Sequence, residues 1–140
     1  MMRQNSFEIV SRGVVMVSWT ADELARIGQA DELQIASLRS DGSLRPYVII
    51  WVVRAGDELY VRAAHGLETG WYRRAKAAGA GRISAGGVDR DVSFTDPPAG
   101  VAAAVDAEYH VKYDRFGAAY VDPVTGPDVA ELTIRLEPRS

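Results

Sequence analysis

Polar and hydrophobic residues alternate along several stretches of this chain. Residues 32–39 and 58–64 alternate with a period of two, which predicts strands with one buried and one exposed face. The segment Arg45–Arg54 (RPYVIIWVVR) is instead apolar almost throughout and rich in β-branched and aromatic residues. Such a continuous run predicts a strand that is buried on both faces and is therefore central in its sheet.

Three more strands are predicted at Arg82–Ala85, Val88–Phe94 and Glu131–Leu136. The pairs Asp41-Gly42 and Gly86-Gly87 supply the positive φ angles of tight hairpin turns. Because hairpins join most of the strands, we expect a mostly antiparallel sheet or small barrel rather than a doubly wound parallel sheet.

The pattern also predicts three helices. Thr20 and Glu23 have the spacing of a capping box, which starts a short helix that ends near Gly28. A second helix is expected at about 70–78, and a periodic apolar face predicts the longest one at 101–116. Prolines and glycines make residues 118–128 a predicted loop.

The length of 140 residues fits one domain, so we expect an N-terminal extension at 1–18 and a single domain at 19–140. No cysteine is present, which excludes disulfides, thiolate nucleophiles and cysteine-ligated metals and fits a cytoplasmic protein. A net charge of −3 argues against general binding to nucleic acid or anionic membranes. The short apolar run at 14–17 predicts neither a signal peptide nor a membrane helix.

Positive charge is concentrated between residues 62 and 82, against the acidic balance of the whole chain. This stretch holds five basic residues and a single acid, Glu68. One interpretation is an anion site at the start of the second helix, where backbone amides are free. The other is a solvated basic helix face, which suits Arg73 and Lys76 best.

Five segments together resemble the DUF2255 family of bacterial proteins: RPYVIIWVVR, VRAAHG, GWYRR, GRISAGGVDRDVSF and YHVKYDRFG. More loosely, the sequence of strand, loop, Trp-Tyr-Arg helix and hairpin resembles the split-barrel oxidoreductases that use flavin or deazaflavin (F420). This resemblance implies an α+β fold, a mostly antiparallel split β-barrel of about six strands with three flanking helices, and a homodimer.

The resemblance to the split-barrel proteins also implies binding of a phosphate-bearing cofactor, FMN or F420. The matching cofactor-binding positions are Arg45, Arg62, Ala64, His65, Gly66, Trp71 and Arg74. Arginine offers paired donors to a phosphate, and glycine allows close backbone approach. In one respect the chain differs, because Ala63-Ala64-His65 stands where deazaflavin enzymes often have a lysine- or serine-rich loop.

The leading hypothesis is therefore a flavin-type cofactor-binding protein, an oxidoreductase of a small substrate if it is an enzyme. The alternative is a non-enzymatic small-ligand-binding or interaction protein on the same barrel. A hydrolase or lyase using His65 or His110 is a third reading. His65 and Tyr113 are candidate catalytic residues, and Trp71 is either a ring shelf or part of the core.

One further pattern is compatible with two readings. Asp106, His110 and Asp114 share a helix face and would either bind a metal or form surface ion pairs. The second reading is preferred because a metal site normally draws ligands from more than one element, so no metal is expected.

Overall fold

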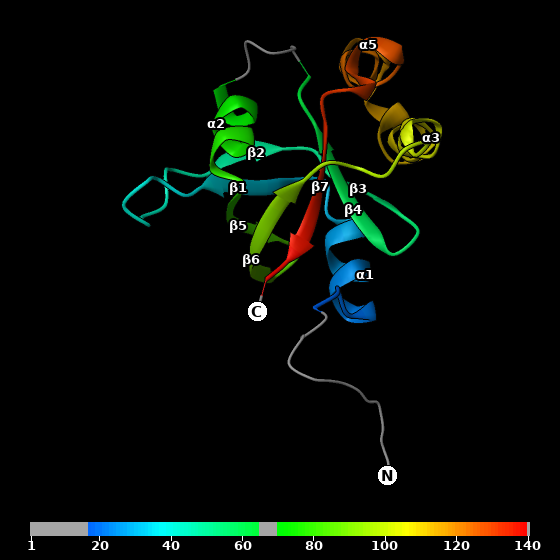
Figure 1. Ribbon diagram of the computed structural model, residues 1–140. Coiled ribbons are helices and arrows are strands. Elements are labelled where there is room, and N and C mark those ends of the chain that lie inside the picture. The colour runs from blue at the N-terminus through cyan, green and yellow to red at the C-terminus, as the bar shows by residue number, and fades with distance from the viewer. Residues whose placement is uncertain (1–16, 65–69, 140) are drawn as a thin grey trace.

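The computed structural model describes residues 17–64 and 70–139 of the chain (Figure 1). The strands are β1 (Leu33–Ser37), β2 (Val48–Ile50), β3 (Val53–Ala55), β4 (Glu58–Arg62), β5 (Ala80–Ala85), β6 (Val88–Thr95) and β7 (Thr133–Pro138). The α-helices are α1 (Ala21–Gln29), α2 (Gly70–Ala78), α3 (Ala102–Tyr113), α4 (Ala118–Val121) and α5 (Pro127–Ala130). Two 3₁₀ turns, η2 (Asp114–Phe116) and η3 (Asp122–Val124), flank α4.

All seven strands form one antiparallel sheet in the order β2-β1-β5-β6-β7-β4-β3. Strands β2 and β3 are consecutive in the chain but lie at the two opposite edges of the sheet. The sheet must therefore curl into a half-barrel, so that the short link between β2 and β3 can connect its two edges. Figure 1 shows α2 beside one part of the curled sheet and α3 and α5 beside another. The predicted α+β, mostly antiparallel barrel is confirmed.

The prediction of one central strand at Arg45–Arg54 is wrong. The segment is divided into β2 and β3, which occupy opposite edges of the sheet, so the sheet has one strand more than predicted. Its apolar character comes from two separate cores: Val52 packs in the barrel core, and Val53 packs in a second core beneath α3. A run that is buried against two different cores therefore resembles a strand that is buried on both faces.

The junction between β2 and β3, which we call the seam, is held by α3. Val52 donates its N–H to the hydroxyl of Tyr113 at 3.2 Å instead of to a neighbouring strand. The carbonyl of Val52 accepts from Nζ of Lys112 at 2.6 Å and lies 3.0 Å from the Tyr113 hydroxyl. Buried backbone groups require such partners, so two adjacent side chains of α3 make the break in the strand possible.

The helix starts follow the sequence pattern more closely. Thr20 accepts from the N–H of Glu23 at 3.1 Å, and the Glu23 carboxylate accepts from the N–H of Thr20 at 2.9 Å. This is the predicted capping box. Leu24 and Ile27 on the same helix are buried in the barrel core.

The predicted loop at 118–128 is wrong, because it contains α4, η3 and the start of α5. Gly117 and Gly126 have positive φ angles of 101° and 95° and start α4 and α5, so short helices fit between the breaks. The described part of the chain accordingly has five α-helices, where three were predicted. Across residues 17–64 and 70–139, no helix is long and apolar enough to cross a membrane.

Candidate functional site

A groove of about 490 Å³ lies where the end of β4 meets β2, α2 and α4. We call it the aromatic groove. Its lining residues are Val48, Ile49, Ile50, Trp51, Arg62, Ala64, Trp71, Ala119, Tyr120, Pro123 and Val124. The lining is mostly apolar with three aromatic rings, and the volume lies within the range of small-molecule sites. Three of the residues predicted to bind a cofactor, Arg62, Ala64 and Trp71, come together here.

Trp51 is held rigidly at the seam. Its ring stacks on Tyr113 with centroids 3.9 Å apart and planes only 5° from parallel. Tyr113 is fixed in turn, because its hydroxyl lies within hydrogen-bonding distance of both the Asp31 and the Val52 carbonyls. The groove therefore has one aromatic wall whose orientation is set before any ligand arrives.

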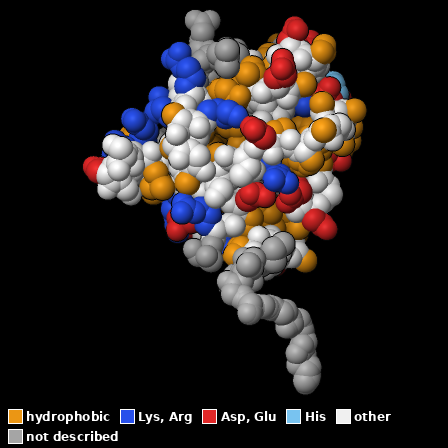
Figure 2. Space-filling model, in the orientation of Figure 1, with side chains coloured by type: hydrophobic (Ala, Val, Ile, Leu, Met, Phe, Trp, Pro, Cys, Tyr) orange, Lys and Arg blue, Asp and Glu red, His pale blue; other side chains and the backbone are white. Residues whose placement is uncertain are grey.

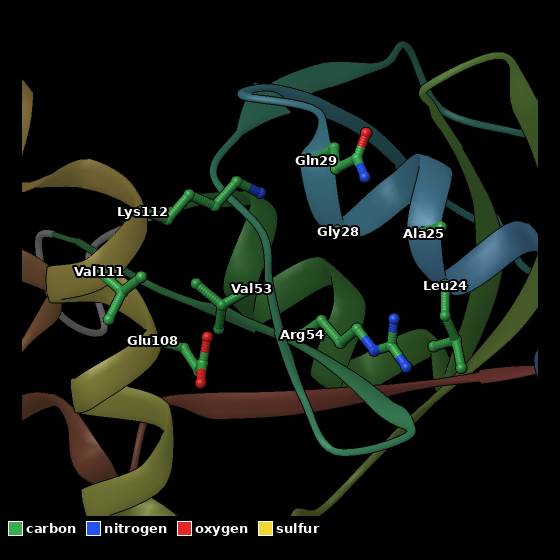
Figure 3. Close-up of a pocket in the computed structure, with 9 residues that line it drawn as sticks. All are labelled: Leu24, Ala25, Gly28, Gln29, Val53, Arg54, Glu108, Val111 and Lys112. Atoms are coloured by element: carbon green, nitrogen blue, oxygen red, sulfur yellow. The ribbon is translucent and has the colours of Figure 1, made fainter. Parts of the chain in front are cut away.

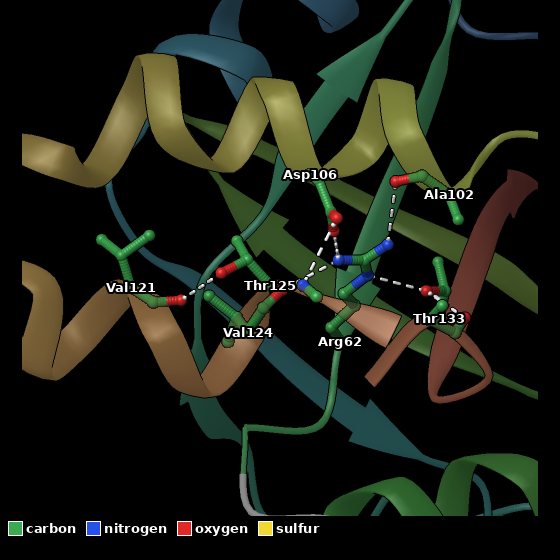
Figure 4. A network of polar contacts seen from close by, with 9 residues as sticks. Arg62, Ala102, Asp106, Val121, Val124, Thr125 and Thr133 are labelled. Carbon is green, nitrogen blue, oxygen red and sulfur yellow. Dashed lines mark hydrogen bonds and ion pairs between the residues drawn. The ribbon is translucent and has the colours of Figure 1, made fainter. Parts of the chain in front are cut away.

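Arg62 is one of the residues that line the aromatic groove, and Figure 4 shows its guanidinium directed toward Asp106 and Ala102 on α3. Nε donates to Oγ1 of Thr133 at 2.8 Å, and Nη1 donates to the Val124 carbonyl at 2.9 Å and to the Asp106 carboxylate. Nη2 donates to the Ala102 carbonyl at 3.3 Å. Arg62 thus ties β4 to α3, η3 and β7.

This network leaves Arg62 little capacity for an outside ligand. A guanidinium has five N–H groups, and these contacts engage all but one of them. The side chain is 0% exposed and its charge is balanced by Asp106. The role predicted for Arg62, direct binding of a phosphate, therefore has weak geometric support, whereas a role in shaping the groove is well supported.

The N-terminus of α2 provides a more accessible positive region. Trp71, in the first turn of α2, is only 8% exposed and packs in the barrel core while also lining the groove. Arg74 folds back along α2, because a Cβ placed on Gly70 would lie 2.7 Å from its Nη1. Gly70 thus leaves the space in which the guanidinium of Arg74 lies beside the first turn of α2, whose leading N–H groups have no partner within the helix.

Figure 2 shows Lys and Arg side chains gathered over α2 and along the neighbouring edge of the molecule. Lys76 in this patch is paired with Asp96 at 2.7 Å, and Arg82 is paired with Asp91 at 2.7 Å. Among the described residues, Arg73 and Arg74 form no ion pair. The basic stretch is therefore partly neutralised surface, and Arg74 is the member whose guanidinium reaches Gly70 at the start of α2.

The remaining predicted site residues lie elsewhere. Arg45 is exposed before β2 and is not among the residues that line the groove, while His65 and Gly66 fall outside the described residues. Tyr113 is fully buried, and burial raises the pKa of its phenol. It is not among the lining residues of the groove but stacks on Trp51, which is one of them. It has no exposed face to offer a substrate.

The metal alternative can also be compared with the geometry. Asp106 pairs with Arg62, whereas His110 Nδ1 lies 2.8 Å from Oδ1 of Asp114. In the part of the chain that the structure describes, no group of three potential metal ligands occurs. The three side chains therefore belong to two separate polar pairs.

Eight of the eleven lining residues are not predicted from the sequence, and among these eight are Trp51, Tyr120 and Pro123. Trp51 was assigned to the interior of a strand, and the other two to a loop. A signal in the sequence is the position of Trp51 near the middle of the apolar run Arg45–Arg54. If the two halves of such a run pack in different cores, the strand must break between them, and a ring at the break can line a cavity. Tyr120 is 66% exposed, and an exposed aromatic side chain is a common mark of a binding surface.

The chain belongs to the family described as uncharacterized protein conserved in bacteria (DUF2255), which matches residues 23–136. The resemblance drawn from its motifs is confirmed. A comparison with curated proteins gives no match.

Solved structures share the fold at low sequence identity. A protein of unknown function from Agrobacterium tumefaciens aligns with a TM-score of 0.61 and 14% identity over 94% of this chain, which spans 58% of that protein. A putative pyridoxamine 5'-phosphate oxidase from Listeria innocua gives a TM-score of 0.55 and 11% identity, covering 84% of this chain and 90% of its own. An F420 reductase gives 0.51 and 18% identity, covering 83% and 92%. These likenesses establish the split-barrel fold.

Proposed function

We propose that the aromatic groove binds a flat, phosphate-bearing cofactor of the flavin type, FMN or F420. The observation that carries the proposal is the meeting of an apolar, tryptophan-walled groove with the N-terminal turn of α2. An apolar slot suits a ring system, and a helix N-terminus beside a guanidinium suits a phosphate. The fold shared with an F420 reductase supports this assignment.

In this proposal, different residues contact the ring and the phosphate of the cofactor. Trp51 and Tyr120 flank the ring, and Trp71 closes the groove at α2. Arg74 and the free amides of α2 hold the phosphate, a role that passes to Arg74 because Arg62 is engaged internally. Arg62 instead fixes Val124, which is part of the groove wall.

The bound cofactor would supply hydride transfer, and the protein would supply position and exclusion of water. If the protein is an enzyme, it is then a flavin- or deazaflavin-dependent oxidoreductase of a small substrate. No described residue in the groove lining is an acid or a histidine. Proton transfer, where the reaction requires it, would come from the substrate or from solvent.

A titration tests the proposal. FMN, FAD and F420 are added separately to the protein, and quenching of cofactor fluorescence is followed together with thermal stability. We expect micromolar binding of one cofactor, weakened about tenfold in Arg74→Ala, the loss expected for one charge-assisted hydrogen bond. Arg73→Ala is the matched control, because Arg73 is exposed on the same helix, whereas Arg74 is the residue whose guanidinium reaches Gly70 at the helix start. Absence of binding by all three cofactors would refute the proposal.

The internal engagement of Arg62 favours one alternative function, binding of a small apolar ligand without a phosphate. Apart from Arg62, the described groove lining carries no charged side chain. Riboflavin separates the two functions, because it has the ring system of FMN without the phosphate. Equal affinity for riboflavin and FMN would favour the alternative, and tighter binding of FMN would favour the cofactor.

We further infer a homodimer that covers this face of the barrel. Ile49, Tyr120 and Phe116 are large apolar side chains that are 57%, 66% and 43% exposed beside the groove and the adjoining hollow around Trp51. Covering them would remove apolar surface from water. Light scattering on the purified protein tests this, and a mass of one chain at micromolar concentration would contradict it.

A further inference from the structure

A second hollow, of about 340 Å³, lies between α1 and α3 over β3. We call it the lysine cleft. Figure 3 shows Leu24 on α1, Val53 and Arg54 on β3, and Glu108, Val111 and Lys112 on α3 around it. No residue is shared with the lining of the aromatic groove. The lysine cleft is therefore a separate feature, and the proposed function does not use it.

Lys112 is held in place at this cleft. Its Nζ donates to the Val52 carbonyl at 2.6 Å and lies 5.1 Å from the centre of the Tyr113 ring. Burial lowers the pKa of the Lys112 amine to about 8, Asp31 opposes that change, and Arg115 adds to it. A neutral amine that donates one N–H to a carbonyl keeps its lone pair, so the hydrogen bond does not prevent nucleophilic attack.

The other charges around Lys112 do not neutralise it by direct pairing. Glu108 lies one turn earlier on α3, yet among the described residues neither it nor Lys112 takes part in an ion pair. Glu108 and Lys112 have the i,i+4 spacing that favours an ion pair on a helix, but the structure, which describes both residues, has no ion pair between them. Arg54, from β3, is engaged by the Gly56 carbonyl and weakly by Asp57.

The chain provides its own comparison. Of its sixteen basic residues only two, Lys76 and Lys112, are lysines. Lys76 is bound to Asp96 at the surface, and that hydrogen bond raises the pKa of its amine. One lysine is thus stabilised as a cation and the other is placed beside a cleft where its charge is disfavoured.

We propose that Lys112 is the reactive amine of a second site, which takes small aldehydes as an imine. The lone pair of Nζ attacks the carbonyl carbon and forms a carbinolamine, and loss of water then gives the C=N bond. The amine loses two protons and the carbonyl loses its oxygen, which leave together as water, so the step needs no oxidant or reductant. Glu108, across one helical turn in the same cleft, is placed to carry the proton that the departing hydroxyl requires.

The shape and charge of the lysine cleft limit the aldehyde. Val53 and Val111 give apolar walls, and the volume suits a small molecule. Arg54 in the lining keeps its positive charge when the Lys112 amine is neutral, so an aldehyde that carries an acidic group has a cationic partner there that a neutral aldehyde does not use. Glyoxylate is a probe with both features, and propanal is its neutral counterpart.

The test is reductive trapping on the full chain. The protein is incubated with glyoxylate and cyanoborohydride at pH 8, and peptide mapping by mass spectrometry gives the rate of carboxymethylation at Lys112 and at Lys76. About half of the Lys112 amine is neutral at pH 8, against less than about 1% for a lysine of ordinary pKa. Lower basicity offsets part of this advantage, so we expect Lys112 to react about tenfold faster than Lys76.

Two further measurements make the result decisive. In urea the two rates should become equal, because the selectivity comes from the fold. Glu108→Gln should slow the reaction at Lys112 several-fold and leave the reaction at Lys76 unchanged. Equal rates in the native protein, or faster reaction of Lys76, would overturn the proposal. Both lysines are read in the same wild-type molecule, so this outcome does not depend on whether any variant folds.

Discussion

The aromatic groove and the lysine cleft are separated along the chain by one residue, Val52. Trp51 lines the groove and Val53 lines the cleft, so the two residues that flank the seam face different cavities. The groove is apolar and its one buried charge is paired, whereas the cleft has two cations and a carboxylate in its lining. Neighbouring positions of one apolar run thus serve sites of opposite character.

The difference has a structural cause in α3. Val52 has no strand partner, so its carbonyl accepts from Lys112 and Tyr113 and its N–H donates to the hydroxyl of Tyr113. Tyr113 supports Trp51 on the groove side, and Lys112 is left half-buried on the cleft side. A break in a strand therefore fixes an aromatic wall on one side and a desolvated amine on the other.

Both cavities depend on the attachment of α3 to the barrel, and the prediction with the largest expected effect tests this attachment. Asp106→Ala leaves Arg62 buried without its counter-ion, and we expect a loss of about 3 kcal/mol in the free energy of unfolding. Ligand binding in the groove and selective labelling of Lys112 should both decline, because both depend on the position of α3. Urea unfolding followed by tryptophan fluorescence measures the stability.

Asp114→Ala is the matched control for that variant. Asp114 follows the same helix, and its pair with His110 is half exposed, so its removal should leave the unfolding midpoint nearly unchanged. If both variants lose similar stability, Arg62 does not hold α3 in the way described.

The second prediction concerns the seam. Tyr113→Phe keeps the ring on Trp51 but removes the hydroxyl, which leaves the N–H of Val52 buried without a partner. We expect a loss of about 2 kcal/mol in unfolding free energy. Tyr120→Phe removes a hydroxyl from an exposed ring and should cost nothing measurable in the same urea experiment. Equal stability of the two variants would show that the hydroxyl of Tyr113 is dispensable at the seam.

Local pattern predicted much of the fold. The alternation at 58–64, the capping box at Thr20 and the tight turn at Gly86-Gly87 each depend on a few residues, and the corresponding elements form where expected. The seam could not be predicted in the same way. An apolar run reports that side chains are buried but not how many cores bury them, and the partners of Val52 lie about sixty residues away.

The candidate site shows the same limit. The resemblance to the split-barrel proteins implied Ala64 and Trp71 as site residues, and both line the groove. The role of Arg62 depends on Asp106, forty-four positions later, which sequence spacing alone does not connect to it. Lys112 has a local signal in hindsight, since lysine is rare in a chain that otherwise uses arginine.

The third prediction separates the two cavities. Tyr120→Ala removes an exposed ring of the aromatic groove and should weaken FMN or F420 binding up to about tenfold, the loss expected for one aromatic contact. The labelling rate of Lys112 should stay the same, because Tyr120 is not in the lysine cleft. Fluorescence titration and peptide mapping on one preparation give both values. A parallel decline in both would mean that the cavities are coupled.

The smallest effect concerns the two lysines and depends on the sign of each pKa change. The pKa of Lys112 is lower when folded, at about 8, so below pH 8 its protonation favours the unfolded chain and stability rises as pH increases from 8 toward 10.5. Relative to Lys112→Met, the wild-type protein should gain about 1 kcal/mol between pH 7 and 9.5, a value reduced for solvent screening. The pKa of Lys76 is raised, so its contribution is constant below pH 10.5 and is lost only above it. In urea unfolding, the stability of the wild-type protein minus that of the variant should therefore rise with pH for Lys112→Met and stay constant for Lys76→Met. Equal pH dependence of the two differences would contradict the different environments of the two amines.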